Sequence, residues 1–163
     1  MVPNVALRKI DFSEKEILGG MFLEYAREIL PENEFDTTTA LRRLDTYWNE
    51  EERSALFIMG NDKIAGFVLI NSFCVVEVRE PRYSIAEFYV KESFRKNKVG
   101  TLAAIKAFNL FRGYWEVRQM ATNKAAMKFW KMVITNYTSN KFESISMSNE
   151  QWSGEIQLFS NGL

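Results

Sequence analysis

The chain has 163 residues, 47% hydrophobic and 26% charged, a balance typical of one globular domain spanning residues 1–163. Its 21 basic and 21 acidic residues cancel, which excludes a global charge that would draw it to nucleic acid or an anionic membrane. The lack of histidine excludes His-based triads and His-ligated zinc, so we expect no metal; the single Cys74 excludes an intrachain disulfide and favours a cytoplasmic location. We expect no secretory leader, because the N-terminus lacks a basic segment followed by an apolar run, and no membrane span, because no apolar run approaches ~20 residues.

The first part of the chain predicts a strand and then a helix. Residues Val5–Ile10 alternate between apolar and polar side chains, as a half-buried strand does. Ser13 and Glu16 have the spacing of a capping box, which places the start of a helix just after them. Apolar residues then recur at helical spacing as far as Leu30, and Pro31 is expected to stop the helix.

The next part predicts a second helix and a β-hairpin. The helix is expected to follow Thr38 or Thr39, with one apolar face made of Leu41, Leu44, Tyr47 and Trp48. The hairpin is predicted from two apolar runs around a tight turn, which are Ser54–Met59, Gly60–Asp62 and Lys63–Phe73. Residues Val75–Tyr83 are expected to be a connector, with additional strand as the alternative.

The most informative stretch is a strand, a basic turn and a helix between Ser84 and Phe111. Residues Ile85–Val90 form an apolar run that suits a central strand. The turn after it carries four cations, namely Lys91, Arg95, Lys96 and Lys98, and apolar residues at helical spacing begin near Val99 and Gly100. A helix N-terminus offers unpaired backbone N–H groups and the positive end of the helix dipole, so this turn predicts an anion site for a phosphate or pyrophosphate.

The remaining elements complete a mixed α/β (α+β) domain. They are a strand at Trp115–Ala121, a helix at Asn123–Ile134 with Asn123 as N-cap, and a closing strand pair at Phe142–Met147 and Trp152–Phe159. The order β α α β β β α β α β β predicts a mixed, mostly antiparallel sheet with helices on both faces. Ligands of such sheets sit at the carboxyl ends of strands, where the basic turn lies.

Two blocks of the sequence resemble the GNAT superfamily of acyl-CoA-dependent N-acyltransferases. The strand IAEFYV followed by Arg95–Gly100 resembles the family turn Arg/Gln-x-x-Gly-x-Gly/Ala, and Asn123–Ala126 with Phe129 and Trp130 resembles a second family block. The resemblance implies the family fold and direct transfer of an acetyl group from acetyl-CoA to a primary amine, without an acyl-enzyme. The implied acetyl-CoA contacts are Phe88, Tyr89, Val90, Arg95, Lys96, Asn97, Lys98, Val99, Gly100, Thr101 and Asn123.

The sequence departs from the family pattern at two positions. Lys98 replaces the middle glycine of the turn, where a positive φ would strain a lysine although its charge suits phosphate. Trp130 replaces the tyrosine that often protonates the leaving thiolate, and an indole N–H is no practical acid. Tyr137 and Tyr89 are the candidate acids by residue type. The alternative function is a non-catalytic or weakly catalytic acyl-CoA-binding module that acts through a protein partner.

The general base and the acceptor site are less specified. Glu87 is the one acid inside the central strand, where burial would raise its pKa and suit it to act as base; an exposed or ion-paired carboxylate on the other face is the alternative. Glu77 and Glu80 are weaker candidates. Residues that bear on a small-molecule or peptide amine acceptor are Tyr47, Trp48, Glu32, Glu34 and Asp36, with core packing or a solvated loop as their simpler roles. The closing strand pair is also compatible with a homodimer.

Overall fold

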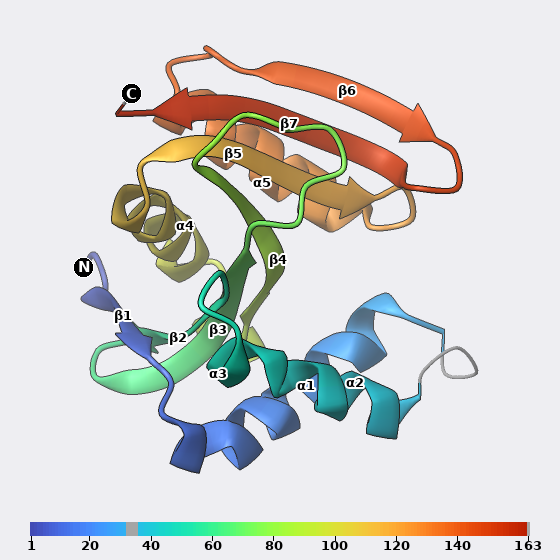
Figure 1. The fold of residues 1–163 in the computed structure, drawn as a ribbon. Coiled ribbons are helices and arrows are strands. Elements are labelled where there is room, and N and C mark those ends of the chain that lie inside the picture. The colour runs from blue at the N-terminus through green and yellow to red at the C-terminus, as the bar shows by residue number, and fades with distance from the viewer. Residues whose placement is uncertain (32–35, 163) are drawn as a thin grey trace. The chain divides into compact units, whose positions relative to one another are not determined.

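The computed structural model describes residues 1–31 and 36–162, and Figure 1 traces them along the chain. Its elements in order are β1 (Val5–Lys9), η1 (Phe12–Glu14), α1 (Lys15–Ile29), α2 (Thr37–Leu44), α3 (Thr46–Asn49), β2 (Ser54–Gly60), β3 (Lys63–Asn71), β4 (Arg82–Val90), η3 (Glu92–Phe94), α4 (Val99–Leu110), β5 (Gly113–Met120), α5 (Lys124–Tyr137), β6 (Glu143–Ser148) and β7 (Ser153–Asn161). The predicted order of strands and longer helices is therefore confirmed.

The chain divides into two compact units. The first comprises Met1–Ile70 with Glu87–Ala103, and the second comprises Asn71–Ala86 with Ala104–Leu163. Because the border crosses β4 and α4, each unit holds one part of these two elements.

The first unit is an antiparallel arrangement of β1, β2 and β3 joined by the end of β4. β1 pairs with β2, and β2 pairs with β3 through the predicted hairpin (Figure 1). Asn61 and Asp62 form the hairpin turn with φ of 49° and 64°, the left-handed conformation that two-residue hairpin loops need. Phe57, Phe67 and Leu18 are fully buried in its core.

The second unit contains a parallel pairing. The first part of β4 runs parallel to β5, from Arg82 opposite Tyr114 to Ile85 opposite Val117. β5 pairs antiparallel with β7, and β7 pairs antiparallel with β6, so the predicted closing strand pair is confirmed (Figure 1). In this core, the rings of Phe108 and Trp115 pack edge to face, with their centres 5.0 Å apart and their planes at 74°.

The strands are hydrogen-bonded in the order β1-β2-β3-β4-β5-β7-β6. This mixed, mostly antiparallel sheet confirms the predicted fold class. Within the described residues, no helix combines the length and apolar character that crossing a membrane requires.

Two local predictions about the first helices are wrong. The capping box is not Ser13 with Glu16 but Asp11 with Glu14, because a 3-10 turn precedes α1 and takes the cap two residues earlier. The predicted second helix is two short helices, with Tyr47 and Trp48 on α3 rather than α2.

The acidic loop before α2 is only partly described. The Asp36 carboxylate accepts a hydrogen bond from the Thr38 backbone N–H at 3.1 Å and so caps α2. Glu32 and Glu34 lie outside the described residues.

Candidate functional site

The candidate site is the turn that joins the end of β4 to the start of α4. α4 begins at Val99, as the sequence predicts, and the turn residues Lys96, Asn97 and Lys98 are exposed. Lys96 and Lys98 have φ of 65° and 69°, so the lysine at the family's glycine position does adopt the left-handed conformation. Only a specific local requirement keeps non-glycine residues there, since each costs ~1–2 kcal/mol.

Val99 fixes the start of α4 in the first unit. Its side chain is fully buried with Ala103, Ile58 and Ala65, and the partly buried Val90 packs against this cluster. Helix N-termini leave backbone N–H groups without helical partners. The exposed turn therefore presents backbone N–H donors and lysine charges at a helix start that the buried Val99 holds in place.

Side chains of β4 alternate between two environments near its end. Phe88 and Val90 pack toward the cluster that holds α4, whereas Glu87 and Tyr89 contact α1. The predicted site residues of β4 therefore separate into two groups, one on each face of the strand.

Glu87 is half-buried and accepts a hydrogen bond from the Tyr25 hydroxyl. Burial raises the pKa of Tyr25 well above its ordinary value, and the charge and hydrogen bond of Glu87 raise it further. Tyr25 therefore stays protonated and donates. Glu87 is therefore not fully exposed, which excludes one form of the alternative, and its role as base stays a prediction.

Tyr89 lies beside this pair in an aromatic cluster. Its ring centre is 5.9 Å from that of Tyr25 and 5.8 Å from that of Phe67. Its hydroxyl donates to Glu24 at 3.1 Å. Burial, with the Glu24 hydrogen bond, raises the pKa of Tyr89 to about 12, which makes its hydroxyl a weak proton donor near neutral pH.

Arg95 turns back from the turn toward β4 and α1. Its Nε donates to the Val90 carbonyl at 2.7 Å, and its Nη2 donates to both carboxylate oxygens of Glu28, at 2.9 and 2.8 Å. The sequence predicts Arg95 as part of the anion site, but these partners on α1 and β4 could not be read from it.

The other two predicted site residues belong to the second unit. The Asn123 side chain caps α5 by accepting the Ala126 N–H at 3.1 Å, as predicted. The Tyr137 hydroxyl donates to Asn109 at 2.8 Å and accepts from Asn161 at 3.0 Å. The roles of Asn123 and Tyr137 toward acetyl-CoA and its thiolate stay predictions.

Trp130 and Glu77 occupy structural positions in the second unit. Trp130, at the family's tyrosine position, is buried and its ring centre lies 6.1 Å from that of Phe108. Glu77 is also buried, and Arg79 hydrogen-bonds its carboxylate, which holds the pKa of Glu77 below its usual value. An anion held in this way is a poor base.

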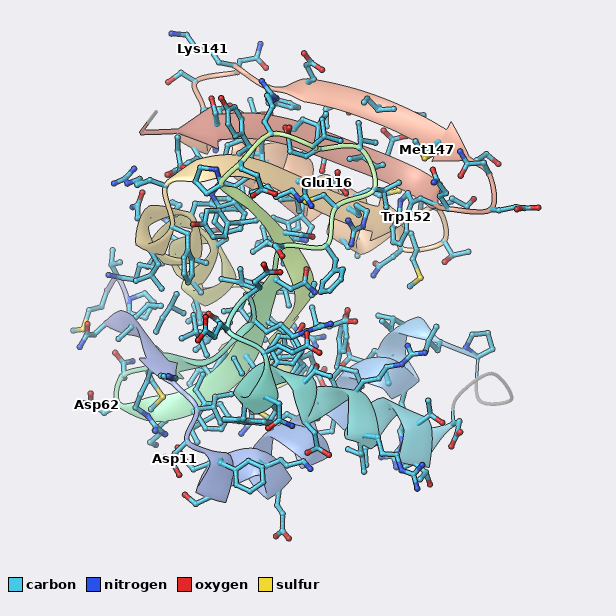
Figure 2. The ribbon with its side chains drawn as sticks, in the orientation of Figure 1. Asp11, Asp62, Glu116, Lys141, Met147 and Trp152 are labelled. Carbon is cyan, nitrogen blue, oxygen red and sulfur yellow. The ribbon has the colours of Figure 1, made fainter. Side chains whose placement is uncertain are left out.

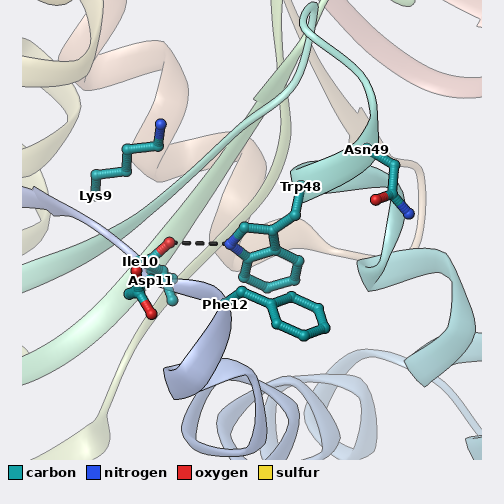
Figure 3. Close-up of a pocket in the computed structure, with 6 residues that line it drawn as sticks. All are labelled: Lys9, Ile10, Asp11, Phe12, Trp48 and Asn49. Atoms are coloured by element: carbon teal, nitrogen blue, oxygen red, sulfur yellow. Dashed lines mark hydrogen bonds between the residues drawn. The ribbon is translucent and has the colours of Figure 1, made fainter.

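A separate hollow of about 620 Å³ lies where β1 leads into η1 (Figure 3). Its wall contains Trp48, whose indole N–H donates to the Ile10 carbonyl at 3.0 Å, and Phe12, whose ring meets that of Trp48 edge to face. Trp48, a candidate acceptor residue, lines it, but none of the predicted acetyl-CoA contacts or catalytic residues does. In the residues that the structure describes, no cluster of His, Cys, Asp and Glu could hold a metal ion.

Sequence reasoning missed three residues of α1 that contact the end of β4 and the turn. They are Glu24, Tyr25 and Glu28. The signal available was their spacing, since positions 24, 25 and 28 share one side of a helix. That spacing does not say which strand the side faces.

Comparisons with known proteins agree with this geometry. The family model described as "Acetyltransferase (GNAT) family" matches residues 21–133, and the chain therefore belongs to the GNAT acetyltransferase family. A comparison with curated proteins found no match.

Solved structures with the same fold are distant in sequence. An acetyltransferase from Thermus thermophilus has 13% identity and a TM-score of 0.71, over 98% of this chain and 99% of that one. The aminoglycoside acetyltransferase AAC(6')-Ib, solved with coenzyme A and kanamycin, has 11% identity and a TM-score of 0.73, over 96% and 95%. The PaiA N-acetyltransferase from Thermoplasma acidophilum, solved with coenzyme A, has 12% identity and a TM-score of 0.63, over 97% and 99%.

Proposed function

We propose that residues 1–163 act as a single N-acetyltransferase domain that moves an acetyl group from acetyl-CoA directly to a primary amine. The observation that carries the proposal is the β4–turn–α4 unit, in which exposed lysines and a helix N-terminus follow a strand end. Family membership and solved complexes of AAC(6')-Ib with acetyl-CoA and with coenzyme A support it.

Acetyl-CoA binds along the end of β4 and over the turn in this proposal. The pyrophosphate takes backbone N–H groups of Lys96–Thr101, and Lys96 and Lys98 add charge. The pantetheine arm runs beside Phe88–Val90, and the N–H near Val90 polarises the thioester carbonyl. Asn123 is the proposed hydrogen-bond partner of the arm from the second unit.

Direct transfer is what the family resemblance implies, and the character of the single cysteine is consistent with it. Cys74 is the only cysteine, and burial together with the nearby Glu116 charge raises the pKa of its thiol to about 12. A thiol with that pKa holds almost no thiolate at neutral pH. An acyl-enzyme on Cys74 is therefore disfavoured, and in this proposal the amine attacks the thioester itself.

Glu87 is the proposed base that takes the proton from the acceptor amine. It is half-buried, and Tyr25 holds its carboxylate in one orientation. Tyr137 is the proposed acid for the departing thiolate. The acceptor class, a small molecule or peptide with a primary amine, is supported at the level of small molecules by the kanamycin complex of AAC(6')-Ib.

Turnover tests the proposal directly. Purified protein is mixed with acetyl-CoA and a panel of aminoglycosides, polyamines and peptide amines, and free thiol is followed with a chromogenic reagent. We expect thiol release that depends on one amine class. Thiol release absent with every amine, although acetyl-CoA binds, would contradict catalysis.

Glu87→Gln tests the base in the same assay. We expect kcat to fall by ~10²-fold or more and the acidic limb of the pH–rate profile to disappear, with KM for acetyl-CoA little changed. Glu16→Gln, an exposed acid in the first turn of α1, is the matched control and should keep the wild-type profile. A Glu87→Gln profile that follows wild type would exclude Glu87 as base.

The second candidate function, an acyl-CoA-binding module acting through a protein partner, is favoured by one observation. Trp130 stands buried where the family often has its acidic tyrosine, and an indole does not supply a proton to a thiolate. Acetyl-CoA binding without turnover would select this function.

A further inference from the structure

Arg95 joins three parts of the first unit through one side chain. Its guanidinium bonds the last carbonyl of β4, at Val90, and the carboxylate of Glu28 on α1. Its central carbon also lies 5.5 Å from the ring centre of Tyr89. Arg95 itself begins the exposed turn, so these contacts fix the direction in which the chain leaves β4.

The contribution of this arrangement is geometric rather than Coulombic. The side chains of Arg95 and Glu28 are 38% and 44% exposed, and exposed ion pairs contribute only ~0–1 kcal/mol. A planar guanidinium, however, holds several donors in fixed directions, which a lysine ammonium does not. Arg95 can therefore satisfy a backbone carbonyl and a carboxylate at the same time.

We propose that Arg95 is a positioning residue for acetyl-CoA and not a ligand of its phosphates. It holds the end of β4 and the start of the turn against α1, so that the strand end beside the pantetheine arm and the Lys96–Thr101 backbone are both arranged before the cofactor binds. The inference rests on the proposed function.

The alternative is that Arg95 swings out to bind pyrophosphate, and the local chemistry opposes it. The move would leave the Val90 carbonyl and Glu28 without this donor, and the Glu28 carboxylate would repel an incoming anion nearby. Lys96 and Lys98 are exposed on the turn and supply positive charge without that cost.

The two roles predict opposite effects for Glu28→Gln. If Arg95 positions the turn through Glu28, loss of the carboxylate weakens cofactor binding. If Arg95 is a phosphate ligand, the same substitution frees it and removes a repelling charge, so CoA binds as well as before or more tightly. S-acetyl-pantetheine, which lacks the pyrophosphate, distinguishes the two roles independently. Loss of a phosphate ligand would weaken CoA alone, whereas loss of a residue that holds the strand end would weaken both probes.

The experiment measures dissociation constants of CoA and S-acetyl-pantetheine by NMR titration for wild type, Arg95→Lys, Arg95→Gln and Glu28→Gln. Arg8→Gln is the matched control, because Arg8 makes a similar fork to Glu14, at 2.9 and 2.8 Å, and lies 5.2 Å from the ring centre of Phe57. We expect both Arg95 variants to weaken both probes about tenfold, Glu28→Gln to weaken both by a smaller factor, and Arg8→Gln to leave both unchanged. Weakening confined to CoA, or tighter CoA binding by Glu28→Gln, would overturn the proposal.

Hydrogen exchange of the free protein separates this inference from the proposed function. Faster amide exchange at residues 91–99 is expected in Arg95→Gln and not in Arg8→Gln, whether or not a cofactor binds. Unchanged exchange at residues 91–99 in Arg95→Gln would overturn the positioning role. A wild-type protein that binds neither probe would contradict the proposed function alone.

Discussion

Glu116 on β5 is a buried carboxylate that anchors the connector before β4 (Figure 2). Its carboxylate accepts hydrogen bonds from the backbone N–H groups of Val75, Val76 and Glu77 at 2.7, 2.8 and 2.9 Å. Arg118 forms an ion pair with the same carboxylate. Burial alone would raise the pKa of Glu116, but these backbone hydrogen bonds and Arg118 hold it below the usual value. The charged form is thus the one that the second unit stabilises.

Glu116→Gln should destabilise the protein by ~2–4 kcal/mol, because an amide replaces a charged acceptor and turns a donor toward the connector N–H groups. Urea unfolding at neutral pH measures the loss. Glu150→Gln, an exposed acid before β7, should change the free energy of unfolding by less than ~0.5 kcal/mol. Equal midpoints for Glu116→Gln and wild type would refute the anchoring role.

The same carboxylate gives the stability a defined pH dependence. A pKa that is lower in the folded state than the unfolded value of 4.5 contributes stability above pH 4.5. That stability is lost as pH falls through the folded pKa, since both states then bind the proton. The difference between wild type and Glu116→Gln should therefore shrink in urea titrations run progressively below pH 4.5. A difference that stays constant would show that Glu116 carries no such linkage.

Lys98 combines a strained backbone with a proposed binding role. Its φ is 69°, so Lys98→Gly should raise the free energy of unfolding by ~0.5–1 kcal/mol while it weakens CoA binding through loss of the charge. Lys106→Gly in the exposed middle of α4 should instead cost about 1 kcal/mol. Urea midpoints and CoA titrations test the two effects. Destabilisation by Lys98→Gly would show that the turn holds no relievable strain.

At the scale of elements, β3 and the end of β4 approach closely at Gly66. A Cβ on Gly66 would lie 1.9 Å from the Tyr89 carbonyl oxygen and 3.0 Å from the Val90 Cα. The Lys91 N–H also donates to the Ala65 carbonyl at 2.8 Å. Gly66 therefore sets the position of the strand end that carries the proposed site.

Gly66→Ala should destabilise by about 3 kcal/mol, because the added methyl group meets backbone rather than a movable side chain. Gly20→Ala on α1 is the matched control: apart from its chain neighbours and the adjacent backbone of its own helix, no atom lies within 4 Å of the added Cβ. Helix propensity should therefore stabilise this variant by ~1 kcal/mol. Thermal unfolding of both variants measures these opposite changes. Two shifts of the same sign would contradict this account of the close approach.

Sequence patterns predicted the elements wherever one periodicity was strong. The apolar run of β4, the helical repeat from Val99 and the hairpin turn at Asn61 and Asp62 all appear as expected. The capping box failed because Asp11 and Ser13 are both good cap residues and only tertiary context chooses between them. The prediction of a single second helix was wrong because the apolar residues keep helical spacing across the point where α2 ends and α3 begins.

The candidate site was predictable only where it is local in sequence. The basic turn and the helix start are adjacent in the chain, so the local residue pattern predicts both of them. The partners Tyr25 and Glu28 lie more than sixty positions away from Glu87 and Arg95, and no local pattern encodes such a pairing. The positive φ of Lys98 was inferable only through the family's glycine.

At the scale of the whole molecule, the residues predicted for the proposed function are distributed over both compact units. The first unit carries the end of β4, the turn and Glu87, and the second carries Asn123 and Tyr137. The central claim is that this chain binds acetyl-CoA. A ligand that binds only the folded state must stabilise that state, whichever acceptor the protein uses.

The most direct test is the thermal unfolding midpoint with and without acetyl-CoA, using CoA as a second ligand. Acetyl-CoA at ~100 times its Kd should add ~2.7 kcal/mol. For a chain of this length, that gain corresponds to a rise in Tm of roughly 5–10 °C. We predict a rise of that order with both ligands, and an unchanged Tm at millimolar acetyl-CoA would contradict the account.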